Sequence, residues 1–238
     1  MFSSASYLEA PPGDWDPAPP VHKEDKANSR PNKPQDLAQL TAREALFTIR
    51  FYFMWLMLFI NVTCGIALIS VASPMAQEVA GVTALGAASM VGLMGLFNGL
   101  GRIGWASFSD IIGRPITFSL FFIIQIIAFI VLAQTTHAGI FQMMVYVILL
   151  CYGGGFATVP AYLGDMFGAR ELSAVHGNTL TAWAAAGLAG PMIVSRVREA
   201  TGSYSGTLYF FSVLFAVAFV VSILAKMNIS KLRALKVT

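Results

Sequence analysis

The chain has 238 residues and a net charge of +3, and its composition is 56% hydrophobic and only 11% charged. Soluble globular domains carry about 25% charged residues, so this composition excludes an ordinary soluble fold. The weak basic balance does not indicate nucleic-acid binding, because its positive charges are distributed as expected for a membrane topology.

Six apolar stretches are each long enough to cross a membrane as a helix, which takes about 20 residues at 1.5 Å per residue. We therefore predict an all-α membrane protein with a six-transmembrane-helix bundle over residues 41–228. A Pro-rich segment, residues 1–40, precedes it and a basic cytoplasmic tail, residues 229–238, follows it. The spans are expected at Phe51–Ser73, Ala84–Phe108, Ile116–Gln134, Gly139–Tyr162, Ala174–Ser195 and Ser205–Lys226.

The segment of residues 1–40 is rich in Pro and charge and has too little apolar surface to offset the entropy of ordering, so we expect it to be disordered. When the helices are threaded alternately through a bilayer, the 15 Lys and Arg residues all fall on one side except Arg102, Arg196 and Arg198. Positive loops mark the cytoplasmic side, so both termini are expected in the cytoplasm and the protein in the plasma (inner) membrane.

The second span carries Arg102 within its apolar run, and Asn98, one turn earlier, shares its helix face. An arginine there costs roughly 2.5–3.5 kcal/mol to insert and usually marks a substrate path. Two interpretations stay open. Arg102 either forms a structural ion pair with Asp110 or Asp165, or it is the fixed cation of an anion site.

Local residue patterns give three expectations about the helices. Gly95 and Gly99 match the small-x-x-x-small pattern that lets helices approach closely in lipid. Pro74 is expected to end the first span. Gln125 is almost the only polar residue of the third span, which we expect to be peripheral or to face lipid.

Aromatic side chains at Tyr152, Phe156 and Trp183 are candidates to shape a pocket, although aromatics in membrane helices more often serve packing. No arrangement of catalytic residues is present, and the G-x-G-x-x-G match at Gly99–Gly104 lies inside an apolar helix rather than after a strand. Two distant cysteines give no metal-ligand spacing. We expect no enzyme activity, no cofactor and no metal.

Asp110, Gly113 and Arg114 follow the second span, where an acid, a turn glycine and a base can lock helix ends in one conformational state. The alternative is a solvated loop that merely obeys the positive-inside rule. The stretch Ala106-Ser-Phe-Ser-Asp-Ile-Ile-Gly-Arg114 resembles the major facilitator superfamily loop motif, G-x-L-x-D-x-x-G-R-R/K. It departs from that motif at Ala106, Phe108, Ile111 and Pro115.

Three longer stretches, Leu56–Gln77, Met94–Arg102 and Pro160–Gly168, resemble the second half of the oxalate:formate antiporter family. The resemblance implies alternating-access transport of small carboxylates, with residues 1–40 as the central loop. It also implies that Arg102 contacts the substrate carboxylate and that Tyr152 and Phe156 are pocket aromatics.

The oxalate exchanger of that family has a lysine in a Thr-Ala-Lys context, where this chain has Thr181-Ala-Trp183. One fixed positive charge balances one carboxylate, which favours a monocarboxylate such as formate, lactate or pyruvate over oxalate. The resemblance also implies a second six-helix half as a partner, either another copy or a separate N-terminal half. The alternative is a non-transporting truncated half or a membrane interaction partner.

Overall fold

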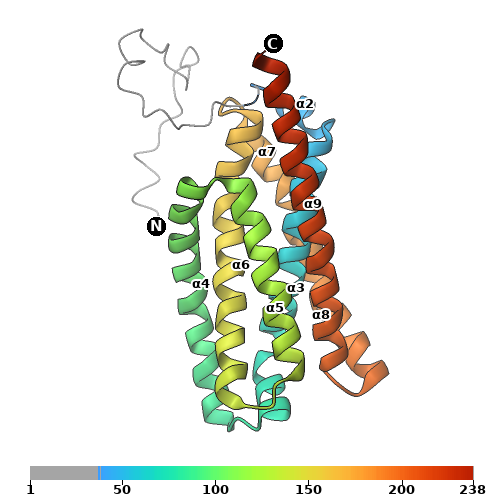
Figure 1. Ribbon diagram of the computed structural model, residues 1–238. Coiled ribbons are helices and arrows are strands. Elements are labelled where there is room, and N and C mark those ends of the chain that lie inside the picture. Colours follow the sequence, from blue (N-terminus) through green and yellow to red (C-terminus); the bar gives the residue numbers. More distant parts are fainter. Residues whose placement is uncertain (1–36, 38, 238) are drawn as a thin grey trace, which may run out of the picture.

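The computed structural model describes residue 37 and residues 39–237, and these are helical apart from short connections (Figure 1). Residues 1–36 of the segment expected to be disordered lie outside the described residues. The prediction of six spans is confirmed, because six described helical segments are long and apolar enough to cross a membrane. The helices are α2 (Ala42–Leu46), α3 (Ile49–Ala80), α4 (Ala84–Ile112), α5 (Arg114–Gln134), α6 (Ala138–Phe167), α7 (Leu172–Thr179), α8 (Thr181–Thr201) and α9 (Ser205–Val237).

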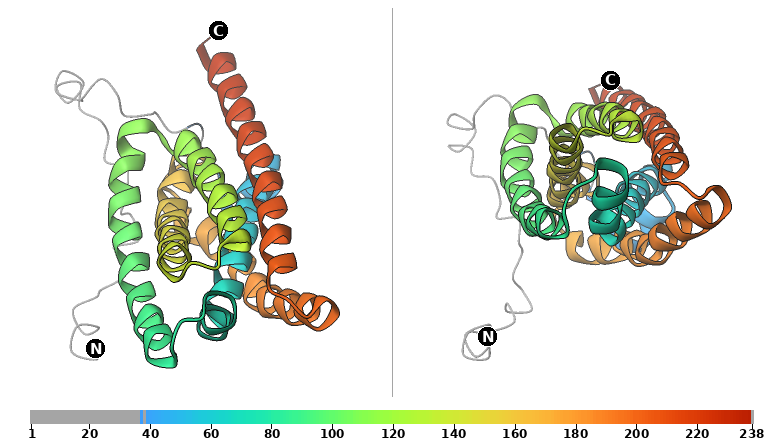
Figure 2. Two further views of the ribbon diagram at one scale, coloured as in Figure 1. Left: turned by 60° about the horizontal axis from the view of Figure 1, so that its bottom comes forward. Right: turned by 90° about the horizontal axis from the view of Figure 1, so that it is seen from below.

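The six spans form two layers. In the first layer α4 packs on α6, α6 on α3, and α3 on α8; α7 and α8 together make one span with a break at Leu180. Behind this layer, α5 and α9 pack on each other and against α6 and α3. Both views of Figure 2 show α4 and α8 on opposite sides of the bundle, with α6 and α3 between them.

The rear layer is held together by aromatic side chains. Phe122 of α5 lies 6.0 Å from Phe215 of α9, and Phe129 lies 5.5 Å from Phe215 and 5.7 Å from Phe211, all measured between ring centroids. These rings are buried within the bundle. Because lipid tails are as apolar as these side chains, close van der Waals packing and not the hydrophobic effect holds such a layer together.

Two expectations about individual helices are wrong. α3 continues through Pro74 and ends at Gly81, which adopts a left-handed conformation with φ of +61°. A proline removes only one backbone hydrogen bond, and membrane helices tolerate that loss where neighbouring groups compensate. Gln125 does not face lipid: it is fully buried and donates from Nε2 to Asn61 Oδ1 of α3 over 3.0 Å. A buried amide in a bilayer needs such a partner.

The contact between α4 and α6 depends on glycines other than the expected pair. A Cβ at Gly95 or Gly99 would have no neighbour within 4 Å, so these two do not mediate helix packing within the chain. A Cβ at Gly101 would instead collide with the Leu150 backbone of α6, and one at Gly153 would collide with the Asn98 backbone of α4. Within this chain, Gly101 and Gly153 therefore make the close α4–α6 contact, and the expected pair does not.

Candidate functional site

Arg102 lies on α4 with an exposed side chain, one turn after Asn98. Its Nε donates to Asn98 Oδ1 over 3.4 Å, and its guanidinium carbon lies 5.2 Å from the centroid of the Phe156 ring on α6. None of the ion pairs among the described residues includes Arg102. The structural ion pair considered for it is not formed, because both carboxylates proposed as partners contact another arginine.

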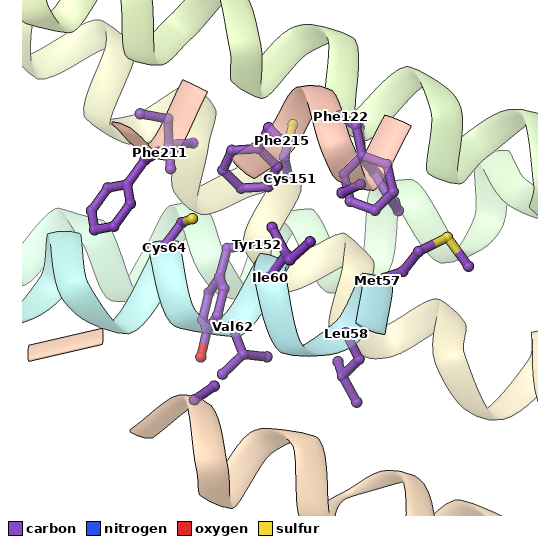
Figure 3. Packing of buried hydrophobic residues seen from close by; sticks show 14 of the residues in the cluster. Met57, Leu58, Ile60, Val62, Cys64, Phe122, Cys151, Tyr152, Phe211 and Phe215 are labelled. Atoms are coloured by element: carbon purple, nitrogen blue, oxygen red, sulfur yellow. The ribbon is translucent and has the colours of Figure 1, made fainter. Parts of the chain in front are cut away.

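Tyr152 of α6 contacts residues of the neighbouring helices α3 and α8. Its side chain is only 7% exposed, and its ring lies against α3 at Gly65. Figure 3 shows this ring beside α3, with its hydroxyl directed away from the Phe211 and Phe215 side of the bundle. The Tyr152 side chain interacts with that of Trp183 on α8 and lies within electrostatic range of Arg102.

The structure thus brings together all five residues expected to bind substrate. They come from three helices of the first layer, and the contacts run from α4 through α6 to α8. α4 and the α7–α8 span have the smallest share of buried residues among the six spans, and Trp183 is 48% exposed. The cluster therefore lies on an open face of the bundle and forms one wall, not an enclosed pocket.

The three residues expected to form a gate lie in one cluster at the C-terminal end of α4. Gly113 joins α4 to α5 with φ of +88°, a conformation that favours glycine. Arg114 Nη2 donates to Asp110 Oδ1 over 2.7 Å. Its Nε also lies 3.3 Å from Asp165 Oδ2 of α6, an ion pair without hydrogen-bond geometry. Arg114 therefore connects the ends of α4, α5 and α6.

A second ionic cluster lies at the opposite end of the bundle. Arg198 of α8 donates to Glu78 of α3 over 2.6 Å and stacks 4.0 Å from the centroid of the Tyr204 ring. Burial raises the pKa of the Tyr204 hydroxyl, and the nearby Arg198 charge opposes that effect. At each end of the bundle, one arginine, Arg114 or Arg198, thus forms an ion pair with a carboxylate on another helix.

Sequence reasoning missed two partners of the site. Asp165 was considered for Arg102 but contacts Arg114, and Asn61 was not singled out although its Nδ2 lies 3.5 Å from the Tyr152 carbonyl oxygen. Both contacts join residues of different helices, so the spacing along one helix does not reveal them. The one signal in the sequence is that Asn61 is a polar residue directly after a bulky apolar run, which indicates a buried amide that needs a partner.

The described residues contain no group of three His, Cys, Asp or Glu side chains that would hold a metal ion. Both cysteines are free and buried, Cys64 in α3 and Cys151 in α6. The chemistry on the open face is therefore that of one guanidinium, one amide and three aromatic rings.

These features define an integral membrane protein with six apolar helices and a polar, positively charged site on one face of the bundle. The profile described as "Major Facilitator Superfamily" matches residues 14–191, and the chain belongs to this family of membrane transporters.

A structural comparison supports the same fold. The chain is similar to the crystal structure of the E. coli fucose:proton symporter FucP, with a TM-score of 0.67 and 14% sequence identity. The match covers 77% of this chain and 44% of the symporter, so this chain spans less than half the length of that protein. At this identity the likeness concerns the fold alone. A search of curated proteins gave no match.

Proposed function

We propose that this chain is the C-terminal half of a carboxylate transporter similar to the oxalate:formate antiporter family, and that Arg102 is the fixed cation that binds the substrate. The observation that carries this proposal is the environment of Arg102. Its contacts are with the neutral Asn98 amide and the Phe156 ring, so its charge stays available for an anion. An intramembrane arginine of this kind is a candidate for a substrate site.

A carboxylate suits this site for geometric and electrostatic reasons. A guanidinium presents a planar fork of N–H donors that matches the two oxygens of a carboxylate. Asn98 is close enough to add a hydrogen bond, and Tyr152, Phe156 and Trp183 supply aromatic surface around the charge. With Trp183 where the oxalate exchanger has a lysine, the wall carries a single positive charge, which favours a monocarboxylate over oxalate.

The open face implies a second half. Transporters of this architecture bind substrate near the bilayer midplane at the interface of two structural repeats, and this chain supplies one wall of such an interface. The partner is either a second copy of the chain or a separate N-terminal half. In this arrangement, the cluster of Asp110, Gly113 and Arg114 with Asp165 holds the cytoplasmic helix ends in one state of the alternating-access cycle.

The proposed location is the plasma (inner) membrane with both termini in the cytoplasm. The connections α4–α5 and α6–α7 lie at the same end of the bundle as the end of α9 (Figure 1). These connections carry Arg114 and Arg170, and the last part of α9 carries Lys226, Lys231 and Arg233, whereas of the described Lys and Arg residues only Arg196 and Arg198 lie at the other end. The excess of positive charge at the first end supports a cytoplasmic assignment for it.

Uptake into liposomes tests the proposed function. The full chain is reconstituted alone and with a candidate N-terminal half, and uptake of labelled formate, lactate and oxalate is measured. Saturable uptake of formate or lactate above oxalate is expected in one of the two preparations, and the preparation that transports identifies the partner. Correct insertion with no uptake in either preparation would instead favour the non-transporting alternative.

A further inference from the structure

The position of Tyr152 depends on a glycine in the facing helix. The Tyr152 ring occupies the space where residue 65 of α3 would carry a side chain. A Cβ built on Gly65 would lie 2.7 Å from Tyr152 Cε2 and 2.9 Å from Cγ, closer than a Cβ approaches any atom in real structures. Any residue larger than glycine at this position must displace the ring.

The backbone around Tyr152 is also held in place, so the ring has little freedom to respond. Gln125 donates to Asn61 Oδ1 over 3.0 Å, and Asn61 Nδ2 in turn lies 3.5 Å from the Tyr152 carbonyl oxygen. A Cβ at Gly155 would meet the same Asn61 amide at 2.6 Å, so α6 lies close against this side chain. A side chain at residue 65 therefore cannot be accommodated by a shift of α6, and the Tyr152 ring itself has to move.

We propose that Gly65 is a positioning residue for the substrate site: the absence of its side chain lets Tyr152 lie flat against α3, with the hydroxyl near Trp183 and Arg102. This inference rests on the proposed function for its transport consequence, but its structural part is independent of transport. Gly65 contacts no substrate in this scheme and acts only through Tyr152.

Fluorescence of Trp183 tests the structural part without any transport. The chain has four tryptophans, and replacing the other three by Phe leaves Trp183 as the only reporter. In this background, Gly65→Ala is expected to shift the Trp183 emission to longer wavelength, because the displaced Tyr152 ring leaves the indole more exposed. Tyr152→Ala alone should give a shift in the same direction.

The double variant Gly65→Ala/Tyr152→Ala tests whether Gly65 acts through the Tyr152 ring, because this variant has no ring to displace. The emission of this double variant should equal that of Tyr152→Ala. The matched control is Gly92→Ala on α4, where a Cβ meets no atom within 4 Å, and it should leave the emission unchanged. A Gly65→Ala shift of the same size with and without the Tyr152 ring would overturn the proposal, and so would no shift at all.

Uptake by the transporting preparation tests the transport consequence. Gly65→Ala should raise the KM for the carboxylate about three- to tenfold, with a smaller effect on kcat, because the displaced Tyr152 ring no longer supplies its surface beside Arg102. An unchanged KM despite a fluorescence shift would contradict the link between Tyr152 and substrate. If wild-type preparations transport nothing, the proposed function fails while the fluorescence result still decides the role of Gly65.

Discussion

The three arginines that define the site and the two ends of the bundle differ in their partners. Arg114 and Arg198 each contact a carboxylate within the chain, whereas Arg102 contacts the neutral Asn98 amide and the Phe156 ring. A carboxylate partner neutralises the charge of an arginine, whereas an amide or an aromatic ring does not, so the charge can still attract an anion. This difference is why the proposed anion site is assigned to Arg102 and not to the other two.

Trp183→Lys tests the specificity argument at this site. The variant adds a second positive charge to the wall formed by α4, α6 and α8, so we expect uptake of oxalate to rise relative to uptake of formate. Competition between the two labelled anions in the transporting preparation measures the ratio. Trp183→Phe is the control, because it keeps an aromatic side chain without charge. An equal change in both variants would show that the charge is irrelevant.

Residue-scale prediction succeeded where the spacing along one helix carried the information. Arg102 and Asn98 lie one turn apart, so their proximity follows from helical geometry. The burial of Gln125 against Asn61 could not be predicted, because it depends on how α5 packs on α3, which the spacing along one helix does not specify. The sequence of α5 alone does not show that Gln125 is buried, because its partner Asn61 belongs to another helix.

Among the helices, the Arg114 cluster connects the ends of α4, α5 and α6, and its two carboxylates differ in exposure. The Asp110 side chain is 66% exposed, whereas those of Asp165 and Arg114 are 22% and 15% exposed. Contacts in the less exposed half of the cluster are screened less by water, so they contribute more to holding the helix ends together.

Arg114→Gln should therefore open this region more than Asp110→Asn does. We expect a local destabilisation of about 1.5–3 kcal/mol for Arg114→Gln, the range for a hydrogen bond to a charged group. Asp110→Asn should cost about 0.2–1 kcal/mol, as for an exposed ion pair. Hydrogen exchange of the amides at the ends of α4 and α6 measures both. Equal protection in the two variants would contradict the assignment.

The glycine contacts between α4 and α6 give a second prediction. Gly101→Ala should destabilise the bundle by about 1–3 kcal/mol, because its Cβ meets the Leu150 backbone and cannot be accommodated by a rotamer change. Gly99→Ala, two residues away on the same helix, should be neutral or stabilising by up to about 1 kcal/mol, since its Cβ meets nothing. Unfolding of both variants in detergent measures the difference, and similar losses would refute it.

The number of spans was predictable because span length follows from bilayer thickness, but the helix ends were less so. α3 passes Pro74 and continues to Ala80, while the fifth span breaks at Leu180 between α7 and α8. A proline costs one hydrogen bond, which packing can offset, and Gly177 and Asn178 before the break also occur within helices, so neither signal alone places a helix end. Helix ends are therefore decided by neighbouring helices as well as by local sequence.

At the scale of the whole molecule, the topology can be tested through thiol accessibility. Cys64 and Cys151 are buried, so a membrane-impermeant reagent should label the native chain poorly in intact cells. A cysteine placed at Ser203, between α8 and α9, should be labelled from outside, whereas one placed at Lys231 should react only after permeabilisation. The reverse pattern would place the termini outside and contradict the assignment from positive charge.

The two-layer arrangement covers the first layer on one side only, with α5 and α9, and leaves α4 and the α7–α8 span the least buried of the six spans. In the proposed transporter, this chain supplies one wall of the binding site and a second half supplies the wall opposite it. The six-helix bundle expected from the apolar stretches is confirmed by the structure.

The most direct test of the account is carboxylate uptake by Arg102→Gln in the transporting preparation. Gln keeps hydrogen-bonding capacity but removes the charge, so we expect uptake of formate or lactate to be abolished while insertion and helix content stay normal. Arg196→Gln, an exposed arginine near the end of α8, is the control and should transport like wild type. Unchanged uptake by Arg102→Gln would remove Arg102 from the substrate site and contradict the central claim.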